Sequence, residues 1–173
     1  MTNRHETPLP SDAGTSLIEA VVAVALLLIL MAGLASLGTV AMTTSENQGH
    51  LSARTTEYAQ DKMEQLLALA YGDATTDTRL FPSPNAGGTG LAVGGSSNPN
   101  APVTGYVDYL DQSGNLLASG GGPPAGWYYK RLWAVSNPSA NLKQITVTVT
   151  VAFGFGKAAP ALSTVVALKS FPF

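Results

Sequence analysis

The residue whose position first raises a chemical question is Glu19, a carboxylate at the start of a long apolar run. Residues 20–42 contain no Asp, Glu, Lys or Arg. An ionisable side chain beside such a run is costly, so it should have a partner or a purpose. One interpretation is that Glu19 takes part in the assembly of apolar helices. The other is that it lies solvated at the level of the lipid headgroups.

A second group of oxygen-bearing side chains, formed by Asp108, Asp111, Ser113 and Asn115, lies farther along the chain. Oxygen ligands at alternate positions are typical of calcium loops. The spacing does not fit such a loop, however, and no glutamate follows that could serve as the bidentate ligand. We therefore expect a turn stabilised by side-chain hydrogen bonds, and no metal site.

Three cations, Lys130, Arg131 and Lys143, lie close in sequence to Trp127 and Trp133. A basic groove lined with aromatic rings could bind single-stranded DNA. Three charges release few counterions, and a net charge of -2 gives no general attraction for nucleic acid. We expect the three stems to extend over a half-buried sheet with their charged ends in water, and we expect no nucleic-acid partner.

Few residues of this chain could carry out catalysis. The two histidines are His5 and His50, and neither has a carboxylate and a nucleophile at a recognisable spacing. The chain has no cysteine, which excludes a disulfide, a thiolate metal site and a cysteine nucleophile. The sequence contains no G-x-S-x-G, H-E-x-x-H or P-loop motif. We expect neither enzymatic activity nor a cofactor.

The apolar run that follows Glu19 is long enough to cross a membrane. As a helix, its 23 residues span roughly 34 Å, and the hydrocarbon core of a bilayer is about 30 Å thick. Of the 173 residues in the chain, 12% are charged and 45% are hydrophobic, which suits a membrane-attached or polymerising protein. The alternative is a secretory signal peptide cut near Ala35 or Ala41. The weakly basic start and the length of the run disfavour it.

The stretch around Glu19 carries a family resemblance. Gly14, followed by Thr15-Ser16-Leu17-Ile18-Glu19 and an apolar helix, resembles the cleavage and methylation signal of type IV prepilins and pseudopilins. In that family a prepilin peptidase cuts after the glycine, and the new N-terminus is methylated. The resemblance implies cleavage between Gly14 and Thr15, methylation of Thr15 and an assembly role for Glu19. Thr15 stands where the family usually has phenylalanine or methionine.

This resemblance gives Glu19 a partner. Once residues 1–14 are removed, the Glu19 carboxylate could meet the terminal amine of a neighbouring subunit, and a pair formed only in the assembly would select its register. The resemblance implies four kinds of partner: other pilins or pseudopilins, the prepilin peptidase and N-methyltransferase, the inner-membrane assembly platform, and the lipid bilayer. It also implies a bacterial inner-membrane location with a cytoplasmic N-terminus, followed by a place in the pilus or pseudopilus.

The helical pattern continues past residue 42 and becomes amphipathic. Residues near a 3.6-residue period predict one buried face, made of Leu51, Thr55, Tyr58, Ala59, Lys62, Met63, Leu66, Leu67 and Ala70. The opposite face is expected to hold Glu57, Asp61, Glu64 and Gln65. Tyr71-Gly72-Asp73 predicts the end of the helix. The stretch YAQDKMEQLLALAYGD, residues 58–73, is similar to the helix end of PilV-like minor pilins.

The remainder of the chain predicts a loop followed by strands. Residues 82–105 are rich in glycine, proline, serine and asparagine, which indicates a partly ordered or mobile surface loop. Strands are expected at 106–110 and 116–117 around a glycine turn, at 127–135, at 145–151 and at 164–169. Strict alternation predicts that one strand face carries Ile145, Val147, Val149, Val151 and Phe153.

These elements predict an α+β fold, with a long N-terminal helix whose amphipathic half packs on a small antiparallel sheet. The expected segments are a leader at 1–14, a transmembrane or filament-core helix at 15–42, an amphipathic helix at 43–72, a variable loop at 73–105 and a sheet-bearing head at 106–173. Together with the resemblance, they imply a minor pilin of a type IV pilus. The alternatives are a minor pseudopilin of a type II secretion system and an unprocessed, single-pass anchored binding module.

Overall fold

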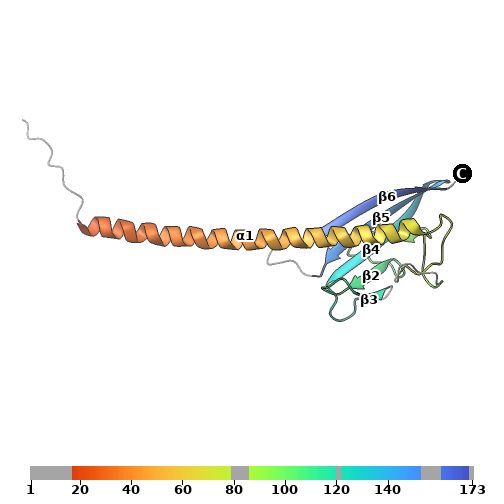
Figure 1. Ribbon diagram of the computed structural model, residues 1–173, viewed down its shortest axis with the longest axis horizontal. Coiled ribbons are helices and arrows are strands. Elements are labelled where there is room, and N and C mark those ends of the chain that lie inside the picture. The colour runs from red at the N-terminus through yellow and green to blue at the C-terminus, as the bar shows by residue number, and fades with distance from the viewer. Residues whose placement is uncertain (1–16, 79–85, 120–121, 153–160, 172–173) are drawn as a thin grey trace, which may run out of the picture. The chain divides into compact units, whose positions relative to one another are not determined.

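The computed structural model describes residues 17–78, 86–119, 122–152 and 161–171. Within these ranges one helix precedes six strands (Figure 1). The elements are α1 (Leu17–Ala68), β1 (Gly94–Gly95), β2 (Val107–Leu110), β3 (Leu116–Ser119), β4 (Tyr129–Ser139), β5 (Leu142–Val151) and β6 (Leu162–Ser170). The chain divides into two compact units, Met1–Thr43 and Thr44–Phe173.

The strands form one antiparallel sheet in the order β3-β2-β4-β5-β6. The short strand β1 pairs with β4 at Val135 and Ala134, beyond the stretch of β4 that pairs with β2. The helix and sheet confirm the predicted α+β class, and their combination is a pilin-like architecture. The predicted hairpin corresponds to β2 and β3, and the three later strands correspond to β4, β5 and β6.

The second half of α1 lies along one face of the sheet (Figure 1). Its apolar residues and those of the sheet form the main core, which contains Leu51, Tyr58, Ala59, Met63, Leu66, Leu91, Tyr106, Leu110, Tyr129, Trp133, Val135, Ile145, Val147, Val149 and Val151. Full burial of one such aliphatic side chain contributes about 1.5–3 kcal/mol. Helix and sheet in this unit therefore hold together by burial of apolar surface.

The alternation predicted for residues 145–151 is confirmed. Ile145, Val147 and Val149 are fully buried beneath α1. The threonines lie on the opposite face, where the Thr148 and Thr164 hydroxyls are hydrogen-bonded across β5 and β6 at 3.1 Å. Phe153 lies outside the described residues.

The helix face differs from the prediction at three positions. Gln65 is buried, whereas Leu67 and Ala70 are exposed. Gln65 follows Lys62 by three residues and shares its face, and its amide donates to the Asp61 carboxylate at 3.0 Å. The helix ends at Ala68, before the predicted stop at Tyr71, so the helical period no longer applies to Ala70.

The described part of the glycine-rich segment, residues 86–105, is packed against the sheet, which agrees with the partial order that its composition allows. Residues 82–85 lie outside the described ranges, but Leu91 is fully buried and β1 pairs with β4. Gly95 has a φ of 82°, and a Cβ there would collide with the Trp133 carbonyl oxygen, so only glycine fits this approach. The segment is fixed to the sheet by its backbone and by one leucine.

The turn between β2 and β3 is stabilised by side-chain hydrogen bonds, as predicted. The backbone N–H groups of Ser113 and Asn115 each donate to Asp111 Oδ1 at 2.8 Å, and the Asn115 side-chain amide donates to Oδ2 at 2.9 Å. These bonds, that of the Asn115 side chain foremost, lower the pKa of Asp111. Asp108 does not join the turn, because its carboxylate is buried among cations.

Candidate functional site

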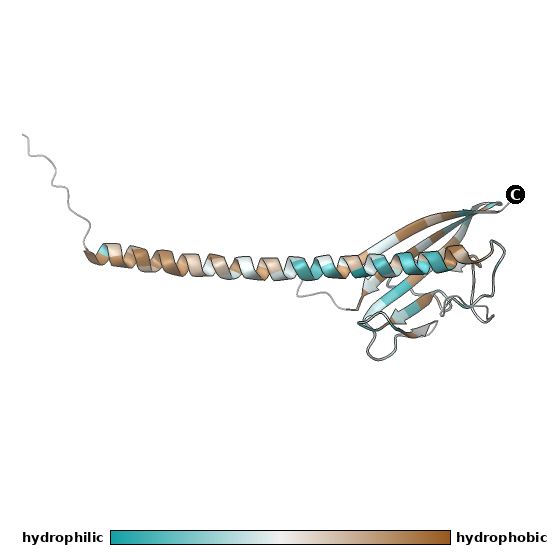
Figure 2. Cartoon of the chain, in the orientation of Figure 1, coloured by the Kyte–Doolittle hydropathy of each residue, from teal (hydrophilic) through white to brown (hydrophobic). Residues whose placement is uncertain are grey.

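The first unit presents an exposed apolar helix. Across residues 17–43 of α1, the exposed fractions of the large apolar side chains run from 51% at Val22 to 85% at Leu17. Figure 2 shows this half of α1 as predominantly hydrophobic, while hydrophilic residues are frequent in the other half. The helix is long and apolar enough to cross a membrane. Apolar surface of this extent is typical of segments that contact lipid or other protein chains.

Three hydroxyl-bearing side chains interrupt this apolar surface, and each bonds to its own helix. Ser36 donates to the Ala32 carbonyl at 3.0 Å, Thr39 donates to the Ser36 carbonyl at 2.8 Å, and Thr43 donates to the Thr39 carbonyl at 3.1 Å. Such back-bonding is compatible with an apolar environment, because no donor is left without an acceptor.

Glu19 lies in the first turn of α1 and is exposed. At this position a carboxylate interacts favourably with the N-terminal end of the helix dipole. Gly14 and Thr15, the residues assigned to cleavage and methylation, lie outside the described residues. Of the three predicted site residues, the structure therefore describes Glu19 alone.

A buried charge cluster in the second unit was not predicted. It consists of Lys62 and Asp61 on α1, Asp108 on β2 and Arg131 on β4. Asp108 Oδ2 lies 2.8 Å from Lys62 Nζ and 2.9 Å from Arg131 Nη2, and the side chains of Asp108 and Lys62 are fully buried. Arg131 Nη1 lies 2.8 Å from the half-exposed Asp61. The cluster therefore balances two cations with two carboxylates.

Lys62 has further contacts that fix its position. Its ammonium group donates to the Thr78 hydroxyl at 2.8 Å and lies 4.1 Å from the centre of the Trp133 ring. Burial lowers the pKa of Lys62 from 10.5 to about 8, although the attraction of Asp108 opposes the shift. Asp108 Oδ1 is buried and has no hydrogen-bond partner in the described part of the chain.

The cluster corrects the prediction made for the three later cations. Arg131 and Lys143 do not extend their charged ends into water, because both are buried. Lys143 donates to the Leu91 carbonyl at 2.7 Å. Lys130 points to the opposite face of β4 from Arg131 and donates to the Pro99 carbonyl at 2.5 Å. The three residues therefore do not form one surface patch. One feature of the sequence indicated a buried charge cluster: Lys62 lies on the predicted buried face of the helix.

The chain was compared with protein-family models, with curated proteins and with solved structures. None of the three comparisons gives a match. The pilin-like architecture therefore rests on the helix and sheet themselves.

Replacement of Asp108 by asparagine should strongly destabilise the head. Asp108→Asn leaves Lys62 and Arg131 buried without their shared carboxylate, and breaking a buried ion pair in this way costs roughly 3–5 kcal/mol. The free energy of unfolding would be measured in detergent by urea titration, followed by the fluorescence of Trp127 and Trp133. Asp111→Asn is the exposed control and should destabilise the head much less than Asp108→Asn, because its carboxylate pairs with no buried cation. Equal effects of both substitutions would contradict the proposed role of Asp108.

The lowered pKa of Lys62 predicts that the free energy of unfolding of the head depends on pH. Between about pH 8 and 10.5, Lys62 is more fully protonated in the unfolded chain than in the folded chain. The contribution of Lys62 to the free energy of unfolding therefore rises with pH in this range. Relative to Lys62→Met, the wild type should gain about 2 kcal/mol between roughly pH 7.5 and pH 10. The comparison with the variant removes the effects of other titrating groups. Parallel stability profiles of the two proteins would show that the pKa of Lys62 is not lowered.

Proposed function

We propose that this chain is a minor pilin, a structural subunit of a type IV pilus. In this proposal a prepilin peptidase cuts between Gly14 and Thr15, Thr15 is methylated, and the N-terminal helix enters or primes the filament. The observation that carries the proposal is the continuous exposure of apolar side chains over residues 17–43, while the second unit has a core of its own.

The exposed helix can be covered in two ways that succeed each other in time. The bilayer covers it before assembly, because its length matches the hydrocarbon core. Neighbouring helices cover it after assembly, as the resemblance to prepilins implies. Added Cβ atoms at Gly33 and Gly38 would meet nothing within 4 Å in the isolated chain, so contacts within the chain do not require these glycines. Close packing against neighbouring helices would use them.

Glu19 supplies the polar contact of the assembly. Ser36, Thr39 and Thr43 already bond to their own helix. Among the described residues 17–43, Glu19 is thus the polar side chain left for a neighbouring subunit. In an apolar filament core, pairing of its carboxylate with the terminal amine at Thr15 of a neighbour would fix the register.

The proposed location is the bacterial inner membrane, with a cytoplasmic N-terminus and an external head, and then the pilus. A minor pseudopilin of a type II secretion system would share cleavage, methylation and the role of Glu19. The two differ in destination, because a pilus subunit appears in surface filaments and a pseudopilin acts in protein secretion. An unprocessed anchored module would keep its leader and form no polymer.

The mass of the N-terminal peptide tests the processing. It would be measured on protein recovered from membranes and from sheared surface filaments. We expect a peptide that begins with N-methylated Thr15 in both samples. The same peptide in membranes alone, with a secretion defect on deletion, would favour the pseudopilin. An intact Met1, or a terminus near Ser36 or Met42, would contradict the prepilin pathway.

Replacement of Glu19 tests the assembly contact. Glu19→Ala should preserve membrane insertion and cleavage but reduce incorporation into filaments by about tenfold or more, since a charged partner in an apolar interface would be left unpaired. Quantitative immunoblots of membranes and sheared filaments would measure both quantities. Glu46→Ala removes an exposed carboxylate farther along the same helix and serves as the control. Normal incorporation of Glu19→Ala would refute the pairing.

A further inference from the structure

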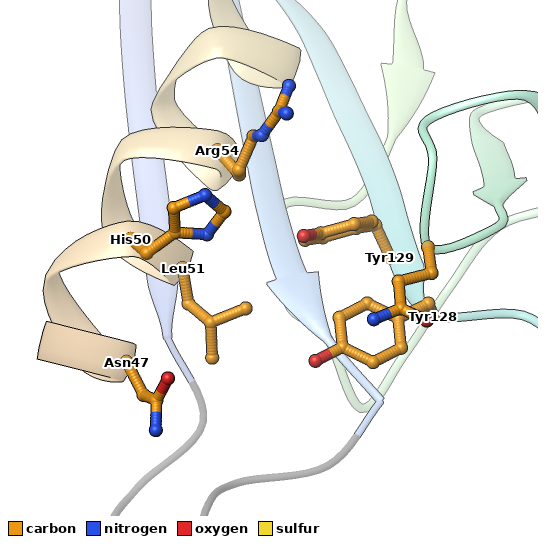
Figure 3. A pocket seen from close by; sticks show the side chains of 7 residues that line it. Asn47, His50, Leu51, Arg54, Tyr128 and Tyr129 are labelled. Carbon is orange, nitrogen blue, oxygen red and sulfur yellow. The ribbon is translucent and has the colours of Figure 1, made fainter. Parts of the chain in front are cut away.

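A pocket of about 200 Å³ lies in the second unit, between α1 and the start of β4. Figure 3 shows that α1 contributes one wall and that two consecutive tyrosines of the opposite wall turn their hydroxyl ends toward α1. The lining residues are Asn47, His50, Leu51, Arg54, Gln112, Tyr128 and Tyr129. The exposed apolar part of α1, residues 17–43, and the buried charge cluster do not contribute to this lining.

The lining residues share one chemical property. All except Leu51 carry a side-chain N–H or O–H group that can donate a hydrogen bond, and no carboxylate from the described ranges of the chain lines the pocket. Leu51 and the faces of the two tyrosine rings add apolar surface. A few polar groups on an apolar wall are typical of small-ligand sites. The absence of carboxylates from the lining disfavours a cation, while the guanidinium of Arg54 favours an anion.

Tyr129 supplies a rigidly held hydroxyl to the wall of the pocket. Its side chain is 97% buried, since only 3% of the residue surface is exposed, and its ring is held edge-on at 4.9 Å by both Tyr58 and Tyr128. Its hydroxyl end is turned toward α1, where it can donate a hydrogen bond into the pocket (Figure 3). Burial, followed by the neighbouring Tyr58, raises the pKa of Tyr129, which keeps the hydroxyl as a neutral donor.

Arg54 is available to a ligand at the edge of the pocket. It contacts Glu57 at 3.2 Å, but the side chains of this pair are 45% and 61% exposed. Exposed pairs of this kind contribute little to stability, so a better placed carboxylate can displace Glu57. The guanidinium also has five N–H donors and can bind two acceptors at once.

We propose that this pocket binds a carboxylate carried on a small apolar or aromatic body. Arg54 pairs with the carboxylate, the Tyr129 hydroxyl donates a hydrogen bond to it, and Leu51 with the tyrosine rings packs against the body. One arginine in the lining matches a single negative charge better than a phosphate dianion. The carboxylate belongs either to a free organic acid or to an acidic side chain presented by another protein. The site does not depend on the proposed pilin function.

Titration with benzoate tests the proposal on the full chain in non-ionic detergent. Benzamide has the same ring without the charge and serves as the control ligand. NMR signals of the imidazole ring report the binding, because the chain has only two histidines and a His50→Gln variant identifies the signal in the pocket. We expect benzoate to shift the His50 signals to saturation and benzamide to leave them unchanged.

Four variants test whether benzoate binds in this pocket. Arg54→Gln should weaken benzoate binding about tenfold and Tyr129→Phe about fivefold, as expected for hydrogen bonds to a charged ligand. Glu57→Gln should strengthen binding about twofold, because it removes the competing carboxylate. Tyr109→Phe removes a buried tyrosine hydroxyl from the opposite face of the sheet and should have no effect. A gain of affinity in Glu57→Gln cannot come from a loss of folding.

A second titration distinguishes the two sources of the carboxylate. N-acetylglutamate N-methylamide represents a side chain in a peptide, and its glutamine counterpart is the control. Competition with benzoate by the glutamate compound alone would indicate an acidic side chain, and binding of benzoate without such competition would indicate a free acid. Equal binding of benzoate and benzamide, unchanged affinity in Arg54→Gln, or no saturable shift with any carboxylate would overturn the proposal.

Discussion

The arrangement of the second unit depends on the carboxylate of Asp108. It compensates Lys62 and Arg131, both of which are buried, and so joins α1, β2 and β4 at one point. Lys62 also donates hydrogen bonds to the carbonyl and the hydroxyl of Thr78, which follows the helix in sequence. Apolar residues of similar size could often stabilise such a core equally well. We infer that the cluster contributes chiefly to the register of the helix on the sheet, because its charges can pair in one position only.

The sequence predicted those parts of the fold that depend on local pattern. Strict alternation identified β5, and a turn motif with Gly114 identified the hairpin of β2 and β3. The charge cluster could not be predicted in the same way, because Lys62, Asp108 and Arg131 are far apart along the chain and pair only after folding. The placement of Lys62 on the predicted apolar face was the available signal. A lysine there requires a buried partner, but periodicity does not say which carboxylate supplies it.

The errors on the helix face have a related cause. Gln65 was assigned to the exposed face by its polarity, yet its position relative to Lys62 decides its burial. Leu91 was overlooked because the residues around it are small and rich in glycine, although a single buried leucine and a backbone pairing with β4 fix that segment to the sheet. Of the predicted site, only Glu19 could be placed, and the pocket was missed because its lining comes from three separate segments, 47–54, 112 and 128–129.

The pocket is linked to Asp108 through the register of α1. The pocket residues Asn47, His50, Leu51 and Arg54 belong to the same helix as Lys62, and Tyr129 belongs to the same strand as Arg131. A slip of α1 by one turn, about 5.4 Å, would exchange the helix side chains that face Tyr129. In one direction the slip would bring Glu46 to the position of His50 and place a carboxylate in a wall that now holds none. The donor character of the pocket therefore requires the helix register that the buried charges select.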